Sequence, residues 1–126
     1  MKRIAASLLA LVLVIAPTSV RPLGLGEIKL QSHLSEPLSA QIPVLSLGNV
    51  DLTSIRVELA SKEQFARAGI DRPFHLSSIR FAFVGEGESS YISVTTREPL
   101  NEPFLNFLLE VDWSNGRLIR EYTMLL

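Results

Sequence analysis

The stretch FLNFLLEVDWSNGRLIREYTMLL, residues 104–126, decides the fold class of this chain. Its two halves are rich in aromatic and branched apolar residues, and they meet at Asn115-Gly116. Asn-Gly between two such runs is the strongest short-range signal for a β-hairpin, because both residues tolerate the positive φ angles of a type I′ turn. The sequence therefore predicts two long antiparallel strands, Phe104 to Trp113 and Gly116 to Leu126.

Upstream of this hairpin, shorter runs alternate apolar and polar residues. A period of two is typical of strands that bury one face and expose the other. Turns rich in Gly, Asn and Ser separate the runs, at 48–49 and at 85–90. By this pattern, strands are expected at 27–33, 38–45, 55–59, 79–84 and 91–96.

About seven short strands with regularly spaced turns favour two packed sheets over any other closure of the core. We therefore predict an all-β fold, an Ig-like two-sheet β-sandwich, formed by residues 27–126. Pro43 falls inside one of the expected strands. Because proline has no backbone N–H to donate, we expect Pro43 at a sheet edge or a bulge.

One short helix is predicted between the strands, over about two turns after Ser61. Ser61 and Gln64 have the spacing of a capping box, and Gly69 supplies the left-handed residue that ends a helix. Phe65 and Ala68 are expected to face inward. This pattern predicts a helix that plugs one end of the sandwich.

The N-terminus has the pattern of an export signal. Lys2 and Arg3 precede an apolar run, 4–16, in which Ser7 is the one polar residue. As a helix, that run is about 20 Å long, shorter than the roughly 30 Å of a bilayer's hydrocarbon core. We predict a helical signal peptide over 1–20, followed by an apolar lead-in over 21–26, and a periplasmic location. Two outcomes stay open for this segment: it is cleaved off, or it is retained as a short inner-membrane anchor. Such an anchor is the one membrane contact that we expect.

Composition excludes several classes of function. The chain has 126 residues and no cysteine, which removes thiol nucleophiles, Cys-ligated metals and disulfides. Without Lys2 and Arg3 it carries 10 basic and 13 acidic residues, scattered singly. A nucleic-acid partner is not expected, because such binding needs a clustered positive face.

Enzyme chemistry is not expected either. His33 and His75 have no second ligand at a metal-binding spacing, and no Gly-x-Ser-x-Gly nucleophile motif occurs. Glu86 and Glu88 lie together in a Gly-rich loop, but two carboxylates are too few for a calcium site. We predict no catalytic residues, no metal and no cofactor.

Contacts with a partner protein are the remaining candidate function. The stretch 67–74 joins a helix stop to two arginines, an aspartate and a Pro-Phe step, so Arg67, Asp71, Arg72 and Phe74 are the candidate contacts. Phe104, Phe107 and Trp113 are expected in the core. At the end of its strand, however, Trp113 is also a candidate contact for a sugar or a protein.

Four blocks, in this order, resemble the N-terminal domain of the FimV/TspA family. The blocks are 23–28 (LGLGEI), 65–74 (FARAGIDRPF), 97–107 (REPLNEPFLNF) and 116–123 (GRLIREYT). The resemblance spans essentially all of 23–126. It implies an envelope protein of Gram-negative bacteria that is tied to type IV pilus assembly and twitching motility, with envelope or pilus-assembly proteins as partners.

Family members usually continue into a peptidoglycan-binding LysM module, a transmembrane helix and a TPR-containing cytoplasmic part. The sequence stops after the block at 116–123 and Met124-Leu125-Leu126, so it is expected to be a stand-alone version or a fragment of a longer protein. Peptidoglycan binding through LysM cannot be carried over. Two alternative functions stay open: a chaperone-like module that adds a strand to a client, and a domain that binds the wall directly.

Overall fold

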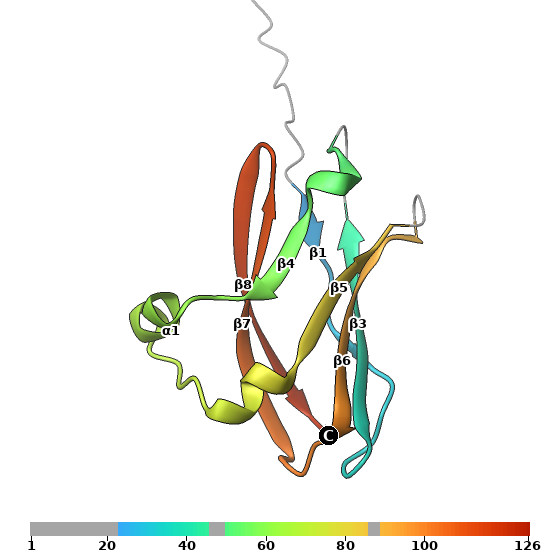
Figure 1. Cartoon of the computed structure of the whole chain (residues 1–126), viewed down its shortest axis with the longest axis vertical. Helices are drawn as coiled ribbons and strands as arrows, with labels where there is room; N and C mark the ends of the chain where they lie inside the picture. The colour runs from blue at the N-terminus through green and yellow to red at the C-terminus, as the bar shows by residue number, and fades with distance from the viewer. Residues whose placement is uncertain (1–22, 46–49, 86–88) are drawn as a thin grey trace, which may run out of the picture.

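The computed structural model describes residues 23–45, 50–85 and 89–126, which form two antiparallel sheets packed face to face (Figure 1). The predicted all-β sandwich with one short helix is confirmed. The described residues form eight strands instead of about seven, because the lead-in and the first expected strand contribute two very short strands. Two short 3₁₀ helices that lie wholly within the described residues, η1 (Leu52–Ser54) and η2 (Phe74–Ser78), connect elements.

The first sheet has five strands. Its order is β1-β3-β6-β5, and β2 pairs with β3 beside β1. Burial alternates along β3 and β6, as expected when one face covers the core and the other meets water. The strands are β1 (Gly24–Leu25), β2 (Lys29–Leu30), β3 (Pro37–Leu45), β5 (Arg80–Val84) and β6 (Tyr91–Pro99).

The second sheet has the order β4-β7-β8 and contains the predicted hairpin. It consists of β4 (Arg56–Leu59), β7 (Phe104–Trp113) and β8 (Gly116–Leu125). Ten register pairs run from Trp113 opposite Gly116 to Phe104 opposite Leu125. The predicted hairpin is therefore confirmed, with β8 ending one residue earlier than expected. Its turn is Ser114-Asn115, however, and neither Asn115 nor Gly116 has the positive φ of the expected type I′ turn.

The core lies between the two sheets and is centred on Phe107. The Phe107 ring is tilted against Phe81 at 5.6 Å and against Tyr122 at 5.9 Å between ring centroids. Leu23 and Leu25 are also buried in this core. The interpretation of 21–26 as a lead-in was wrong for these two residues, because β1 pairs with β3 and turns their side chains inward.

The position of Pro43 differs from the expected sheet edge or bulge. It lies in β3, which has partners on both sides, and the register shift in β3 occurs at Pro37/Ser39 instead. In an antiparallel strand, the N–H and C=O of one residue point to the same side. The Pro43 carbonyl accepts a 2.8 Å hydrogen bond from the N–H of Gly26, in the break between β1 and β2. The missing N–H of Pro43 therefore faces the Gly26 carbonyl, which accepts a hydrogen bond from the Tyr122 hydroxyl instead.

The one α-helix among the described residues, α1 (Lys62–Ala68), has the predicted caps. The hydroxyl of Ser61 accepts from the Gln64 N–H, the Gln64 side chain accepts from the Ser61 N–H, and Gly69 is left-handed at φ 69°. Phe65 is buried as expected, but Ala68 is exposed. Figure 1 shows α1 at the flank of the sandwich, beside the end of β4, instead of at the end of the sheets.

Two side chains of β8 join the sheets along the opposite flank. The Arg120 guanidinium donates to the carbonyl of Leu25, and the Tyr122 hydroxyl donates to the carbonyl of Gly26 at 2.9 Å. The Arg120 charge also lies 4.9 Å from the centre of the Tyr122 ring. These contacts tie β8 to the chain segment that follows β1.

Three predictions fall outside the described residues. These are the signal peptide at 1–20, the turn at Gly48-Asn49, and the loop that carries Glu86 and Glu88. Within the described part of the chain, no helix has the length and apolar character needed to cross a membrane.

Candidate interaction site

A groove of about 630 Å³ lies between the loop after α1 and the outer face of the β7-β8 hairpin. Two segments far apart in sequence, 68–75 and 102–106, line it together with Glu121 of β8. Apart from His75, both segments fall within the blocks that carry the family resemblance. We call this hollow the acidic groove, for the three carboxylates described below.

The floor of the acidic groove is the outer face of β7 and β8. Because side chains alternate across a sheet, Phe104 and Asn106 point away from the core that Leu105 and Phe107 fill. In the register of the hairpin, Phe104 lies opposite Leu125, and Asn106 opposite Thr123. Phe104 is 53% exposed and Leu125 75% exposed, so the floor ends in an apolar pair open to solvent.

The opposite wall is the tight connection from α1 to η2. The Gly69 N–H bonds to the carbonyl of Ala66, and the Ile70 N–H bonds to the carbonyl of Phe65 at 3.0 Å. The latter bond crosses the helix end, as in a Schellman-type stop. Pro73 then sets the entry to η2. This wall is therefore held by the backbone and by the left-handed glycine.

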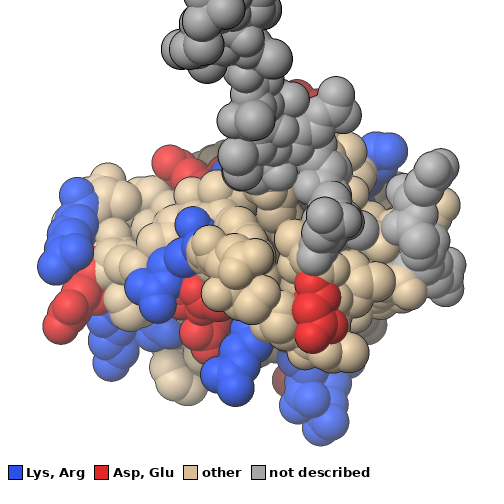
Figure 2. Space-filling model, turned by 90° about the horizontal axis from the view of Figure 1, so that it is seen from above, with Lys and Arg blue, Asp and Glu red and all other residues tan. Residues whose placement is uncertain are grey.

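The charges that line the acidic groove have one sign, apart from a histidine. Asp71, Glu102 and Glu121 contribute three carboxylates, and His75 is the other ionisable residue. Among the described lining residues there is no Lys or Arg. By contrast, the face shown in Figure 2 carries Lys and Arg side chains interspersed with Asp and Glu. The groove is thus a local concentration of negative charge.

A second hollow, of about 380 Å³, shares Ala68 with the acidic groove. It lies between α1 and the same face of the hairpin, and Leu108 and Ile119 form its apolar lining. Gln64 and Arg67 line it from the helix. The two hollows therefore follow α1 along one face of the second sheet.

The structure brings together two of the predicted contact residues. Asp71 lines the acidic groove, and Arg67 lines the adjoining hollow. Arg72 turns the other way, with its guanidinium 5.7 Å from the centre of the Phe65 ring, and it lines the gap between β4 and β5. Phe74 is 91% exposed and is absent from the groove lining.

Trp113 lies far from these residues, at the other end of β7. It is nine positions along the strand from Phe104, or about 30 Å. Its ring packs over Gly116, where an added Cβ would come within 2.8 Å of the indole. The ring is partly buried against the core. Much of the indole is thus used within the fold, and a partner contact at Trp113 stays a prediction.

Sequence reasoning missed Glu102, Phe104 and Glu121. Phe104 was assigned to the core and is half exposed instead. The sequence does contain a signal for this exposure. The core side of the strand is marked by odd-numbered apolar residues, and an even-numbered residue such as Phe104 faces the other side of the sheet. The buried odd-numbered residues are Leu105, Phe107, Leu109 and Val111.

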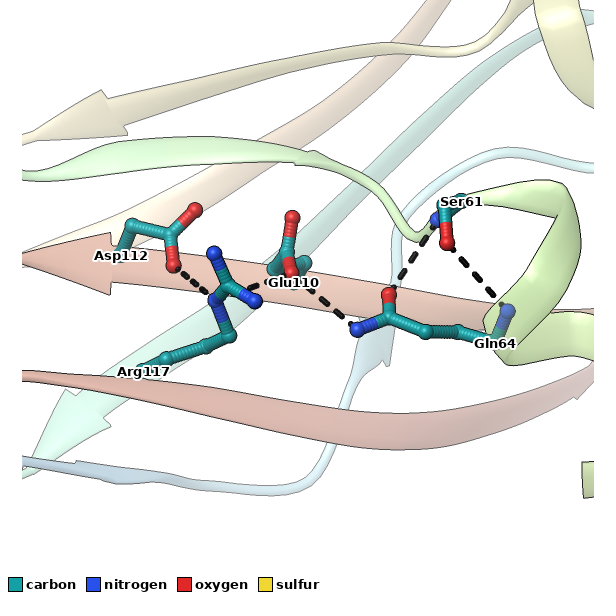
Figure 3. A network of polar contacts seen from close by, with 5 residues as sticks. All are labelled: Ser61, Gln64, Glu110, Asp112 and Arg117. Carbon is teal, nitrogen blue, oxygen red and sulfur yellow. Dashed lines mark hydrogen bonds and ion pairs between the residues drawn. The ribbon is translucent and has the colours of Figure 1, made fainter. Parts of the chain in front are cut away.

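A polar network covers the same outer face nearer the hairpin turn (Figure 3). Glu110, which is 7% exposed, accepts from Gln64 at 3.4 Å and pairs with the Nε of Arg117 at 3.2 Å. The same Nε lies 2.7 Å from Asp112. The capping box places Gln64, so the cap of α1 also anchors the helix to β7.

Glu58, Glu110 and Asp112 are the three acidic groups in the described residues that are close enough to share a cation, with ligand atoms within 4.8 Å. The Arg117 guanidinium already neutralises two of them. Burial, with a smaller contribution from Asp112, raises the pKa of Glu110 above its ordinary value. The cluster is accounted for as a structural ion-pair network, and the expected absence of a metal stays a prediction.

The raised pKa of Glu110 predicts a pH dependence of stability. Because the fold favours the protonated acid, its contribution is present below the ordinary pKa and is lost as pH rises through the folded-state pKa. Relative to Glu110→Gln, the unfolding free energy of the wild type should therefore fall as pH rises from about 4. Urea denaturation of both proteins from pH 4 to 8 measures this, and a constant difference would contradict it.

Gly69 provides a test of the groove wall. Gly69→Ala should cost about 1 kcal/mol of unfolding free energy, because an L-residue is strained at φ 69° even though nothing lies within 4 Å of the added Cβ. Gly24→Ala is the matched control, since its Cβ makes ordinary contacts at 3.7 Å and its φ is not positive. Thermal or urea denaturation compares them; equal effects would show that the left-handed stop is not needed.

Comparison with known proteins identifies the family. The model of the FimV N-terminal Ig-like domain matches residues 23–126. The chain belongs to this FimV N-terminal domain family. It is 47% identical over 105 residues to the motility hub protein FimV of two Pseudomonas aeruginosa strains, PAO1 and UCBPP-PA14. The match covers 82% of this chain but 11% of each relative, so the chain spans about a tenth of their length.

Both the family resemblance and the Ig-like fold expected from sequence are thus confirmed. No solved structure matches the chain. Within this FimV domain, the 65–74 and 97–107 blocks meet at the acidic groove. The residues that carried the resemblance are therefore also the ones that shape the candidate site.

Proposed function

We propose that this chain is an exported interaction domain of the type IV pilus and twitching-motility apparatus, and that it binds a protein partner at the cell envelope. The observation that carries the proposal is the family membership across the whole described fold, together with relatives named as motility hub proteins. A hub acts by holding other proteins, and the proposal assigns this domain binding instead of catalysis.

The surface of the domain supports a binding role. Phe104 and Leu125 form an exposed apolar pair beside a concave groove, and such patches on small domains commonly mark contact sites. The periplasmic location in the proposal rests on the apolar run 4–16 behind Lys2 and Arg3. Mass spectrometry of the mature N-terminus after cell fractionation tests that location.

Photo-crosslinking in the native host tests the binding role. A crosslinking amino acid at Phe104 should capture a pilus-assembly or motility protein from the envelope. The same group at Ala82, on the exposed face of the five-stranded sheet, serves as the control. Unimpaired twitching after deletion of the chain, together with no motility component captured from either position, would refute the proposal.

One observation favours the second candidate, addition of a client strand. β8 is a ten-residue strand at the end of the sheet order, and within the described residues no strand pairs with its outer edge. Open edges of this kind accept extended peptides through backbone hydrogen bonds. The outward amides of β8 should then exchange rapidly in the free protein and slowly with a client; slow exchange in the free protein would exclude this mode.

A further inference from the structure

We propose that the acidic groove binds an extended segment of the partner protein, in which a Lys or Arg side chain lies two or four residues from an aromatic or large aliphatic side chain. This inference deepens the proposed function and rests on it. The cation would lie among the carboxylates of Asp71, Glu102 and Glu121. The apolar side chain would cover Phe104 and Leu125.

The hairpin register places an exposed apolar pair at the end of the groove floor. Phe104 and Leu125 are directly opposite one another, which places their side chains about 5 Å apart on one face. Both are more than half exposed, although large apolar residues in this fold are mostly buried. An exposed aromatic residue at the edge of a concave surface is the usual anchor of a protein contact. This pair therefore selects an apolar side chain.

The ionisable side chains that line the groove are mostly carboxylates. Three carboxylates lie around one hollow, and none of its described lining residues is Lys or Arg, although the chain as a whole has a formal net charge of −1. Complementary charge steers encounter and rejects partners of the wrong sign. An anionic segment, a nucleic acid or an anionic lipid surface would be repelled. A cationic protein segment is therefore the class that fits.

The spacing between the cationic and the apolar side chain of the ligand follows from the strand geometry of the groove floor. Glu121 and Leu125 are four residues apart on the same face of β8, or about 13 Å in an extended strand. Glu102, by contrast, is two residues from Phe104 in sequence and lines the same end of the groove. A cation and an apolar side chain on one face of an extended ligand, two or four residues apart, match these distances. The groove volume, about 630 Å³, lies within the range of sites that enclose a ligand.

A panel of synthetic peptides tests the ligand class. The probe is Gly-Ser-Lys-Ser-Phe-Ser-Gly, with a second form in which three serines separate Lys and Phe. Three matched peptides replace its Lys with Gln, its Lys with Glu, or its Phe with Ser. NMR titration of the labelled protein should shift the amides of Phe104, Asn106 and Glu121, and leave that of Ser93 on the far sheet unchanged.

The expected affinities follow from the strength of surface ion pairs. Replacing Lys by Gln should weaken binding about three- to tenfold, since exposed pairs are each worth a few-fold in affinity. The Glu peptide should produce no shift at the same concentration. Raising the salt concentration should weaken the Lys peptide more than the Gln peptide, because screening acts on the charged pairs.

Charge reversal in the protein is the second part of this test. Glu102→Lys with Glu121→Lys should lower affinity for the Lys peptide at least tenfold and confer binding of the Glu peptide. Glu63→Lys, an exposed position on α1 outside the groove lining, is the matched control and should change affinity less than twofold. Circular dichroism confirms that each variant is folded.

Equal binding of the Lys and Glu peptides, or shifts that avoid the groove, would overturn this inference. Binding of a cation without the apolar residue, such as spermidine with the same affinity, would also overturn it. Crosslinking from Phe104 to a motility protein separates the two proposals. Capture without a charge preference would leave the proposed function standing and remove the inferred ligand class.

Discussion

Replacing Phe107 with alanine is expected to remove about 3–5 kcal/mol of unfolding free energy. The side chain is fully buried between the sheets, and its ring packs on Phe81 of one sheet and Tyr122 of the other. Truncation would leave a cavity that β-sheets close poorly, because the backbone ladder holds the strands apart. A domain of this size has about 5–15 kcal/mol of stability in total, so the variant should be close to unfolding at 37 °C.

Phe74→Ala is the matched control for this substitution. It removes the same atoms from a residue that is 91% exposed, and it should change stability by less than about 0.5 kcal/mol. Urea denaturation followed by tryptophan fluorescence measures both variants against the wild type. Similar losses from the two substitutions would mean that Phe107 is not at the centre of the core, and the assignment of the two packed sheets would then be wrong.

Local sequence signals were enough to predict the hairpin and the helix caps. The polar stretch Ser114-Asn115-Gly116 between two apolar runs marks the place of the turn, and the short turn sets the register of the strands on either side. Ser61, Gln64 and Gly69 act within one helix and need no distant partner. In each case the energy that selects the structure comes from residues close in sequence, so a reading along the chain can find it.

Long-range pairing explains what the sequence reading missed. Leu23 and Leu25 have no strand partner nearby, and they become core residues because β1 pairs with β3 some 20 residues later. Pro43 is tolerated inside the sheet because the Gly26 carbonyl opposite its missing donor accepts a hydrogen bond from the Tyr122 hydroxyl instead. Neither fact can be predicted from the alternation of apolar and polar residues alone. That alternation shows which residues share a face of a strand, but it does not show which strands are neighbours.

Part of the candidate site could be predicted from local sequence, and the part that depends on long-range pairing could not. Asp71 and Arg67 stood out in a stretch of unusual local composition, and the structure places Arg67 in α1 and Asp71 in the loop after it, on adjoining hollows. Glu102, Phe104 and Glu121 come from other segments and complete the groove only through folding. Their charges and exposure carry no local signature. A site assembled from three distant segments is therefore invisible until the sheet order is known.

Removal of the Tyr122 hydroxyl is expected to have the second-largest effect. Tyr122→Phe should cost about 1–2 kcal/mol of unfolding free energy, because the Gly26 carbonyl loses the donor that lies 2.9 Å away while the packing of the ring is kept. This bond is one of two side-chain contacts through which β8 holds the segment after β1. Tyr91→Phe removes the other phenolic hydroxyl, for which the structure gives no hydrogen bond to a described residue, and should cost much less.

High pH should erase the difference between wild type and Tyr122→Phe. Burial raises the pKa of Tyr122 to about 12 from 10.0, and the nearby Arg120 charge opposes this only in part. Because the neutral phenol is the favoured form in the fold, its contribution is fully present below pH 10 and is lost as pH rises toward 12. Urea denaturation of both proteins at pH 8 and at pH 11 measures the change. If Tyr91→Phe loses as much stability at pH 8, or if the gap widens at pH 11, the two sheets are not joined through the Tyr122 hydroxyl.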